Sequence, residues 1–219
     1  FNSRIASSDN SSIKIPWKDL SWSSGGYDVS FNPLVAYKNT NFTLSFWIYI
    51  NDLGDRWQPI FRVVDPGHSD RVPGVWLFSN KRSALHIRHA TDASANSGKP
   101  GEQTRCKISQ YIPVFVTIVF EEGSYTLYYN GSYHTDYRWP SNLRTINNVK
   151  DAYIEIGTTF HNNYVLHRVS VQEETLDSAQ VSSLYQTRIE ELGPLETATG
   201  NARAALGISD SFSDREGFT

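Results

Sequence analysis

The stretch FTLSFWIYI, Phe42 to Ile50, decides the fold, because it alternates and is rich in β-branched and aromatic residues. Alternate residues are apolar and share one face: Phe42, Leu44, Phe46, Ile48 and Ile50. The opposite face is mixed: Thr43, Ser45, Trp47 and Tyr49. One apolar and one mixed face are typical of an antiparallel sheet that packs on a second sheet. The stretch therefore predicts an all-β sandwich.

Strand patterns continue on both sides of this stretch, with short intervals between them. The predicted strands are Tyr27–Phe31, Pro59–Val64, Gly74–Phe78, Ala84–His89, Gln103–Ile108, Val114–Phe120, Ser124–Asn130, Ser132–Tyr137, Ala152–Ile156 and Tyr164–Val171. The core is expected to include a second apolar face, formed by Val114, Val116, Ile118 and Phe120. Asn130-Gly131, between two alternating runs, predicts a tight hairpin whose turn uses the Asn130 side chain.

The chain divides into three predicted parts. Residues 1–26 are rich in Ser, Asn and Gly and contain Trp17 and Trp22, which indicates an extended N-terminal arm. Residues 27–193 form the sandwich and end in one short helix within 175–192, where apolar residues recur at helical spacing. Residues 194–219 form a polar tail that is too poor in apolar groups to order itself. We expect this tail to lie against another surface through four apolar anchors, Leu206, Ile208, Phe212 and Phe218.

Charge is distributed unevenly along a chain of 219 residues whose net charge is −3. This total gives no electrostatic reason to expect a nucleic-acid partner. Residues 56–107 contain nine Lys or Arg against four acidic residues, whereas residues 173–219 contain nine acidic residues against three Arg. The middle of the chain is therefore basic and its end is acidic.

The cell compartment is left open by the sequence. Cys106 is the single cysteine, so no disulfide forms within the chain, and we expect a buried thiol. Three glycosylation sequons begin at Asn10, Asn41 and Asn130. No apolar run approaches the roughly 20 residues of a membrane helix. The chain begins at Phe1 and contains no Met, so we expect it to be part of a longer protein.

Five sequence segments follow one another along the chain: "NFTLSFWIYI", "PGVWLFSNKRSALHIRH", "IPVFVTIVFEEGSYTLYYNGSYH", "YIEIG" and "LHRVSVQEETLDSAQVSSLY". Over about residues 27 to 186 they resemble the concanavalin A-like lectin/glucanase superfamily, in particular its laminin G-like branch. The resemblance implies a jelly-roll sandwich of two antiparallel sheets with a short closing helix. The phrase "FWIYINDLGDRWQPIFRV" is also similar to versions of the fold in large DNA viruses and eukaryotic surface proteins. This similarity implies an extracellular surface or a virion as the location.

Catalysis is not expected from the acidic residues. Glucanases of this superfamily carry Glu-x-Asp-x-Glu on one strand, and the sequence contains no such triplet. Glu155 is the one acid inside a clear strand pattern, and no carboxylate lies two residues away. The interpretation is therefore a solvated acid and a protein that is not an enzyme.

No cofactor is predicted, with calcium as the alternative that the family suggests. Hard cations bind several oxygens from flexible loops. The candidate ligands are Asp65 and Asp70 in one loop and Asn162 and Asn163 in another. Asp-Pro-Gly in the first loop is equally a turn sequence. His86 and His89 fall on opposite faces of their strand, which argues against zinc.

Aromatic and polar residues of the basic middle are the candidates for binding a carbohydrate or a protein partner. They are Trp57, Arg62, Trp76, His86 and Arg88. Both kinds of site use aromatic rings and Arg as anchors, so the sequence does not separate them. The alternative is that Trp76 belongs to the core and that His86 and Arg88 are ordinary solvated residues.

The leading hypothesis is a noncatalytic binding or structural domain, a component of a larger protein assembly or surface such as a virion. Its partners would then be other protein chains. The alternative is a lectin module that binds glycans, and a glycoside hydrolase is the least favoured reading because the paired carboxylates are missing. An open groove of aromatic and polar side chains would favour the lectin, and burial of these residues under another chain would favour the assembly.

Overall fold

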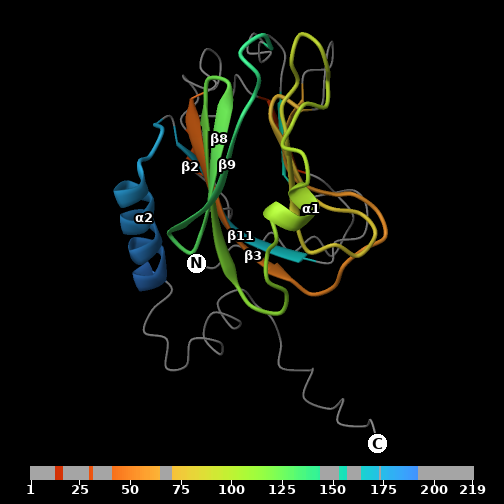
Figure 1. Cartoon of the computed structure of the whole chain (residues 1–219). Coiled ribbons are helices and arrows are strands. Elements are labelled where there is room, and N and C mark those ends of the chain that lie inside the picture. The colour runs from red at the N-terminus through yellow and green to blue at the C-terminus, as the bar shows by residue number, and fades with distance from the viewer. Residues whose placement is uncertain are drawn as a thin grey trace, which may run out of the picture.

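The structure is a computed structural model that describes residues 13–16, 30–31, 41–64, 71–143, 153–156, 164–172 and 174–191. Two sheets face each other across one core, and helix α2 (Ser178–Glu191) lies outside one of them (Figure 1). Neither helix within the described residues is long and apolar enough to cross a lipid bilayer. The predicted tail, with its anchors Leu206, Ile208, Phe212 and Phe218, lies outside the described residues.

The first sheet has five antiparallel strands. Their spatial order is β1 (Ile13–Pro16), β10 (Tyr153–Ile156), β4 (Gln58–Val64), β5 (Gly74–Leu77) and β6 (Leu85–Arg88). The β5–β6 pair is a hairpin in register, with Trp76 opposite His86 and Gly74 opposite Arg88. The middle of the chain therefore forms β4, β5 and the edge strand β6.

The second sheet has six strands. Their spatial order is β2 (Ser30–Phe31), β11 (Tyr164–Gln172), β3 (Phe42–Ile50), β7 (Val114–Glu121), β8 (Ser124–Tyr129) and β9 (Ser132–Arg138). All neighbours are antiparallel except the two-residue β2, which pairs parallel to β11. The predicted sandwich of two antiparallel sheets with one C-terminal helix is confirmed, with β2 as a short exception.

The core lies between the sheets, on the face that the sequence predicts. Strands β3 and β7 pair along their length, with Phe46 opposite Val116. Alternate residues of both strands are buried in the same cluster: Phe42, Leu44, Phe46, Ile48, Ile50, Val114, Val116, Ile118 and Phe120. Side chains from β4, β5 and β6 fill the other half of this cluster. Both predicted core faces are confirmed.

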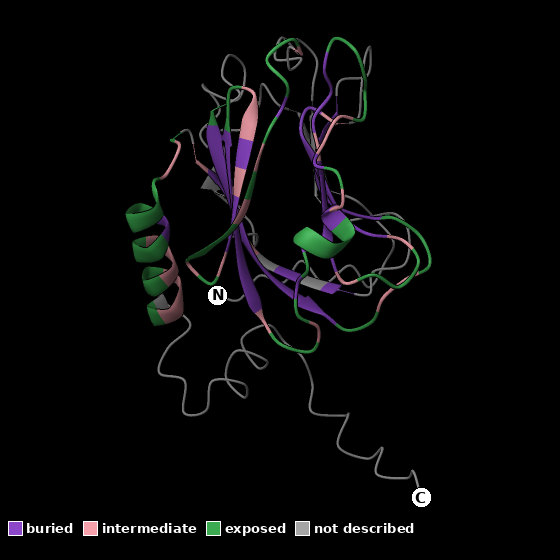
Figure 2. Cartoon of the chain, in the orientation of Figure 1, coloured by how far each residue is buried: buried purple, intermediate pink, exposed green. Residues whose placement is uncertain are grey.

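The mixed face of β3 is also buried, because α2 covers it. Trp47, Tyr49 and Phe115 form a second apolar cluster against Leu184 and Tyr185 of the helix. The Trp47 and Phe115 ring centroids are 5.1 Å apart. Figure 2 shows β3 in purple and the outer side of α2 in green. The six-stranded sheet is therefore closed on both faces at β3.

The hairpin between β8 and β9 matches its prediction. Asn130 and Gly131 both have positive φ, 49° and 75°, as a two-residue turn of this hand requires. The Asn130 side chain accepts a hydrogen bond from the Phe115 N–H at 2.9 Å. A Cβ on Gly131 would lie 2.9 Å from Cβ of Tyr185, so glycine also allows α2 to approach the turn. The side chain of Asn130 therefore serves the turn, as predicted.

Two local predictions differ from the structure. The predicted strand Gln103–Ile108 is wrong: helix α1 (Glu102–Arg105) occupies its first half, after Gly101 with φ of 71°, and a single bridge joins Lys107 to Ala84. Residues 13–16, interpreted from sequence as part of an arm, form β1 and pair with β10. In both segments, pairing with a distant partner decides the structure.

Candidate functional site

The candidate site begins with the loop that carries Trp57, between β3 and β4. Two backbone hydrogen bonds tie this loop to the β5–β6 turn, from the Asn80 N–H to the Asp55 carbonyl at 3.2 Å and from the Lys81 N–H to the Gly54 carbonyl at 3.0 Å. Asn80 and Lys81 have φ of 60° and 55°, which turns their N–H groups toward the loop. The position of Trp57 is therefore fixed by the hairpin beside it.

Trp57 is the exposed member of an aromatic cluster. Its ring centroid lies 4.4 Å from that of His86 and 4.9 Å from that of Phe78. His86 also contacts Phe78 at 4.9 Å and Trp76 at 5.9 Å. Trp57 remains 43% exposed, whereas the other three rings are buried. We call these four residues, together with Arg71, the Trp57 cluster.

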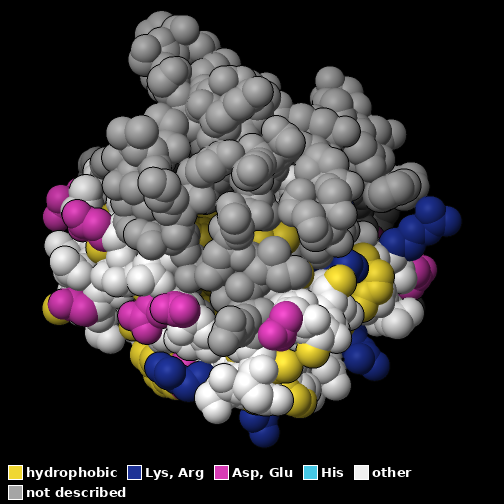
Figure 3. Space-filling model, turned by 90° about the horizontal axis from the view of Figure 1, so that it is seen from above, with side chains coloured by type: hydrophobic (Ala, Val, Ile, Leu, Met, Phe, Trp, Pro, Cys, Tyr) yellow, Lys and Arg dark blue, Asp and Glu magenta, His cyan; other side chains and the backbone are white. Residues whose placement is uncertain are grey.

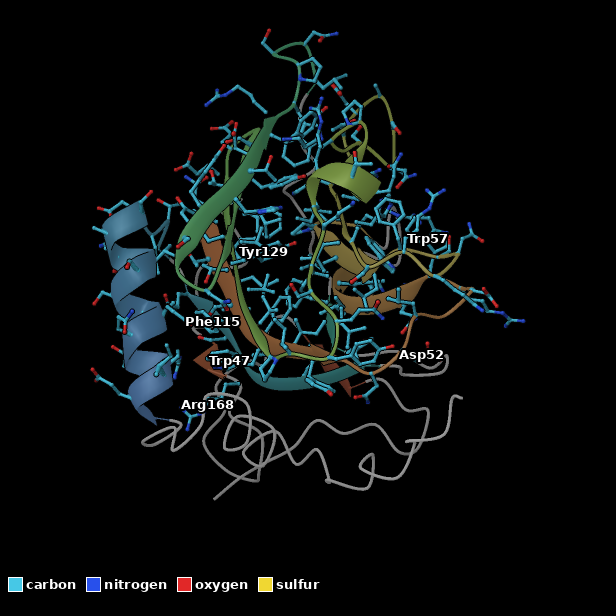
Figure 4. The ribbon with its side chains drawn as sticks, turned by 60° about the horizontal axis from the view of Figure 1, so that its bottom comes forward. Trp47, Asp52, Trp57, Phe115, Tyr129 and Arg168 are labelled. Atoms are coloured by element: carbon cyan, nitrogen blue, oxygen red, sulfur yellow. The ribbon has the colours of Figure 1, made fainter. Side chains whose placement is uncertain are left out.

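Alternation along β5 and β6 places this cluster on the outer face of the five-stranded sheet. Val75 and Ile87 point into the core. Trp76 and His86, their neighbours in sequence, therefore point outward. A Cβ on Gly74 would lie 2.1 Å from Cη2 of Trp76, so the indole lies across this glycine. Trp57 lies on the side of the molecule away from α2 (Figure 4).

Arg71 lies over the ring of Trp76. Its guanidinium carbon lies 5.2 Å from the centroid of the Trp76 ring, a cation–π distance. Trp76 thus has a glycine, an arginine and an imidazole around it. It packs on the outer face of the sheet and does not join the core cluster.

A buried carboxylate lies beneath the cluster. Glu102 of α1 is fully buried, and its Oε1 accepts hydrogen bonds from the Ile87 N–H and the Tyr125 hydroxyl, each at 3.2 Å. Its Oε2 binds Nη1 of Arg88 and lies 3.0 Å from Nδ1 of His86. Because an unpaired buried carboxylate is costly, the Arg88 ion pair accounts for its presence.

The position of Glu102 follows from the edge of the sheet. Strand β6 is an edge strand, and its outward N–H groups need acceptors. Carbonyls of Cys106 and Ser97 accept from Leu85 and His89, at 2.9 and 3.0 Å. Between them, the Glu102 carboxylate accepts from Ile87. The segment before β7 therefore covers this edge with two carbonyls and one side chain.

The electrostatics of the cluster favour a neutral imidazole. Burial lowers the pKa of His86, and the positive charges of Arg88 and Arg71 lower it further. Glu102, whose Oε2 lies 3.0 Å from Nδ1 of His86, opposes this change, and the net pKa shift is downward. The pKa of His86 therefore lies below its unperturbed value of about 6.5, so the imidazole is neutral at pH 7.

Cys106 is buried, as predicted, and burial raises the pKa of its thiol to about 11. Its carbonyl accepts a hydrogen bond from the Tyr129 hydroxyl at 3.0 Å. Tyr129 points from β8 toward the space between the sheets (Figure 4). The thiol therefore lies in the core between the sheets and stays protonated.

The structure brings together most of the predicted binding residues. Trp57 and Trp76 both contact His86, and Arg88 shares the Glu102 carboxylate with His86. Arg62 lies on β4 in the same cross-strand row, opposite Gly74, which is itself opposite Arg88. Arg88 differs from the expected solvated residue, because its guanidinium binds the buried Glu102.

The sequence does not single out three residues of this site: Phe78 and Arg71 of the Trp57 cluster, and Glu102 beneath it. Phe78 ends the predicted strand Gly74–Phe78, so its parity with Trp76 could have indicated it. Arg71 is separated from Trp76 by a turn, and Glu102 reaches β6 from a segment predicted as a strand. No local pattern marks these last two.

The predicted calcium ligands Asp65, Asp70, Asn162 and Asn163 lie outside the described residues, so the calcium site stays a prediction. Within the described residues, no three His, Cys, Asp or Glu side chains converge as metal ligands do. Glu155 pairs with Arg62 through its backbone, as a residue of β10 next to β4.

Charged and apolar side chains are mixed on the visible surface. Seen from above, hydrophobic side chains lie beside Lys and Arg on the right, and carboxylates are more frequent on the left, toward α2 (Figure 3). The Trp57 loop and its turn contribute exposed charges of both signs: Asp52, Asp55, Arg56, Lys81 and Arg82. The surroundings of Trp57 are therefore polar and of mixed charge.

The model of one family, the concanavalin A-like lectin/glucanases superfamily, matches residues 23–182. A search of curated protein sequences finds no match to the chain. Among solved structures, the binding domain of botulinum neurotoxin serotype D is 17% identical, with a TM-score of 0.54 over 73% of this chain and 39% of that one. The binding domain of Paraclostridial Mosquitocidal Protein 1 is 18% identical, with a TM-score of 0.53 over 81% and 43%.

A sialidase of Trypanosoma rangeli is also similar in fold, at 13% identity and a TM-score of 0.51 over 72% of this chain. The chain spans 24% of the sialidase and less than half of either toxin domain. At these identities the likeness shows the fold alone.

Proposed function

Because the chain belongs to the concanavalin A-like lectin/glucanase superfamily, we propose that it is a noncatalytic binding domain of a larger protein assembly or surface. It binds through the Trp57 cluster. One observation carries this proposal: Trp57 is 43% exposed although two ring contacts and a tethered loop fix its position. A large ring that is held rigid yet left open is the usual anchor of a binding surface.

The chemistry of the cluster supports binding without catalysis. The sequence contains no Glu-x-Asp-x-Glu triplet. The carboxylate beneath the cluster, Glu102, is fully buried and already pairs with Arg88. A glycosidase needs two carboxyl groups that flank its substrate, roughly 5 to 9 Å apart. Glu102 does not reach a bound substrate in this arrangement.

The proposed location is an extracellular surface or a virion. The support is an analogy of fold, because the similar solved structures include the binding domains of a botulinum neurotoxin and of a mosquitocidal protein. The partner in this proposal is a chain or a glycan of the surface to which the domain belongs or attaches.

Binding of carbohydrate is the second candidate, and a specific observation favours it. Trp57 offers a flat apolar ring beside the polar imidazole of His86, 4.4 Å away between centroids. Sugar sites combine an aromatic platform with a few well-placed polar groups. The same ring also suits a protein contact, so the experiment must report the nature of the partner.

Photo-crosslinking tests the proposed function. Benzoylphenylalanine replaces Arg56, which is exposed and next to Trp57, in cells that make the whole protein. We expect a crosslink to another macromolecule, identified by mass spectrometry, that disappears when Trp57→Ala is added. The matched control places the same group at Tyr133, which is 59% exposed on β9 of the other sheet. Equal crosslinking at both positions, or none at position 56, contradicts the proposal.

A second assay tests the absence of catalysis. Purified domain is incubated with β-glucans, and new reducing ends are measured against a blank. We expect none. Turnover that is lost on Glu155→Gln would show that the domain is a hydrolase and would overturn the noncatalytic part of the proposal.

A further inference from the structure

Three loops lie at one end of the sandwich, where β3 ends and β7 begins (Figure 1, lower right). They are residues 51–57, 79–83 and 107–113, and we call them together the loop end. Backbone hydrogen bonds join the first loop to the second, as described above. The Ile108 N–H joins the third loop to the second, since it donates to the Ser83 carbonyl at 3.1 Å. The three loops therefore form one connected surface.

Most of the large apolar side chains that are exposed among the described residues lie at the loop end. Trp57 is 43% exposed, Tyr111 60% and Ile112 42%. Within the part of the chain that the structure describes, Tyr133 is the one such side chain outside the three loops. The first and third loops each send another apolar side chain, Leu53 or Ile108, into the core. The loops therefore bury one apolar group each and leave others in solvent.

The backbone of the third loop fixes its two exposed apolar residues. Tyr111 has a φ of 61°, a left-handed conformation that is costly for a bulky residue. Its N–H donates to the carbonyl of Ile50, the last residue of β3, at 3.1 Å. Ile112 precedes Pro113, which restricts Ile112 to extended backbone conformations. Both side chains are therefore held in place before any contact forms, which lowers the entropy cost of binding.

Cations outnumber acids around these apolar side chains. The charged residues of the three loops are all exposed: Arg56, Lys81, Arg82 and Lys107 against Asp52 and Asp55. Four cations and two acids give the loop end a net charge of +2, whereas the whole chain has a net charge of −3. The loop end is therefore opposite in sign to the rest of the protein, and it attracts an anionic surface.

We propose that the loop end docks on an anionic lipid bilayer, with Trp57, Tyr111 and Ile112 among the headgroups and the Lys and Arg side chains beside lipid phosphates. Trp and Tyr are stable at this depth because their rings are apolar and end in a polar group. Lys and Arg are stable there because their stems are apolar and their charges meet anionic lipid. A protein interface usually separates an apolar centre from a polar rim. At the loop end the two kinds of side chain alternate, as in Arg56-Trp57, which fits the headgroup layer better.

This inference rests on the proposed function in one respect, since Trp57 is a contact residue in both. It adds Tyr111 and Ile112, which the proposed function does not use, and it names a bilayer as the surface to which the domain attaches. Binding of this kind is peripheral and depends on salt, because a few apolar side chains and a small net charge hold the protein.

Vesicle flotation of the whole chain measures the contact with lipid. The probes are vesicles of phosphatidylcholine alone and of phosphatidylcholine mixed with phosphatidylserine. We expect binding to the mixed vesicles that weakens as salt rises, and binding about tenfold weaker to phosphatidylcholine alone. Tyr111→Ser combined with Ile112→Ser should weaken binding to the mixed vesicles about tenfold. The matched control, Tyr133→Ser, removes a ring that is 59% exposed outside the three loops and should leave binding unchanged.

A charge reversal gives a second, independent measurement. Arg82→Glu lowers the net charge of the loop end from +2 to zero, so binding to the mixed vesicles should weaken about tenfold. The matched control is Arg138→Glu, the same change at an exposed residue at the other end of β9, and it should leave binding unchanged. Circular dichroism of each variant checks that the sandwich is folded.

The outcomes separate this inference from the proposed function. If the chain binds neither kind of vesicle, or if the loop-end variants bind as well as their controls, the bilayer inference is overturned. The proposed function stands in that case when the position 56 crosslink identifies a macromolecule and depends on Trp57. Vesicle binding that is lost in the Tyr111→Ser, Ile112→Ser variant supports the inference, and it does so even if the crosslink fails and the proposed function is abandoned.

Discussion

The two sheets both carry tryptophan on their outer faces, but among the described residues a helix covers only one of these faces. Trp47, on the six-stranded sheet, is 4% exposed between Phe115 and the helix residue Tyr185. Trp57, beside the five-stranded sheet, is 43% exposed above His86. Figure 4 shows Trp47 and Phe115 facing α2 and Trp57 on the opposite side. The helix turns one aromatic face into a second core, whereas no described helix packs on the other, where Trp57 is exposed.

Both faces have aromatic rings in contact, so ring packing alone does not distinguish a core from a binding surface. The difference lies in the outermost layer. α2 supplies apolar side chains over Trp47, whereas the loop around Trp57 supplies charged residues such as Asp55 and Arg56. The comparison predicts that the two faces respond differently to the same change.

The largest difference is expected between two Trp→Ala substitutions. Trp47→Ala leaves a cavity under α2 and should lower the free energy of unfolding by about 3 to 5 kcal/mol. Trp57→Ala removes a half-exposed ring and should cost about 1 kcal/mol or less. Urea denaturation of both variants measures the values. Equal losses would show that Trp57 is a structural residue and would remove the distinction between the faces.

Acid should destabilise the molecule through two buried histidines, His86 of β6 and His89, which follows this strand. Burial lowers the pKa of His89 to about 4 and also lowers that of His86. A lowered pKa means that the unfolded chain binds the proton more tightly, so this stability is present above pH 6.5 and is lost as pH falls toward 4. The loss from His89 is at most about 3 kcal/mol.

Urea denaturation between pH 7 and pH 4 measures this loss. His89→Phe should flatten the profile in this range, because the titrating group is gone. An unchanged profile would contradict the assignment to His89. The sequence of α2, residues 178–191, contains no histidine, so the helix contributes no imidazole to this loss.

A pair of glycines tests how closely α2 approaches the sheet. Gly131 and Gly123 both have positive φ, 75° and 73°. A Cβ on Gly131 meets Tyr185 at 2.9 Å, whereas one on Gly123 meets nothing within 4 Å among the described residues. Gly123→Ala should cost about 1 kcal/mol from backbone strain, and Gly131→Ala about 2 kcal/mol because the helix must also shift. Equal costs would show that α2 is not held against the turn.

The smallest effect is expected on the covered face. Thr117 is fully buried on β7, and no described residue hydrogen-bonds to its hydroxyl group. Thr117→Val replaces the hydroxyl by a methyl group, so the free energy of unfolding should stay constant or rise by up to about 1 kcal/mol. A loss above that size would indicate that the hydroxyl has a partner, and that the covered face is more polar than the apolar cluster suggests.

The sequence predicts those parts of the fold that depend on local periodicity. Alternation in Phe42–Ile50 identifies the core face, and the Asn130-Gly131 pair identifies the hairpin. The burial of Trp47 and Tyr49 could not be predicted from the strand, because it depends on α2, more than 120 residues away in the chain. Strand β1 was missed for the same reason, since it pairs with β10 at the other end of the domain.

The candidate site was predicted in part. Trp76 and His86 were selected as aromatic and polar residues of the basic middle, and their cross-strand pairing in the structure places them on one face. Glu102 could not be found in this way. Its segment contains alternating residues, yet the single turn of α1 forms where the carboxylate reaches Ile87, Arg88 and Tyr125. A contact that joins three distant groups leaves no local pattern.

Hydrogen exchange tests most directly whether the face that carries Trp57 is the binding face. Amide exchange is measured for the domain alone and in the complex captured through position 56. We expect slower exchange in the complex at residues 54–57 and 76–88, around Trp57, and unchanged exchange in α2 and in the strands beneath it. Protection of residues 178–191, with no change around Trp57, would contradict the account and would place the partner on the side of the molecule that the helix covers.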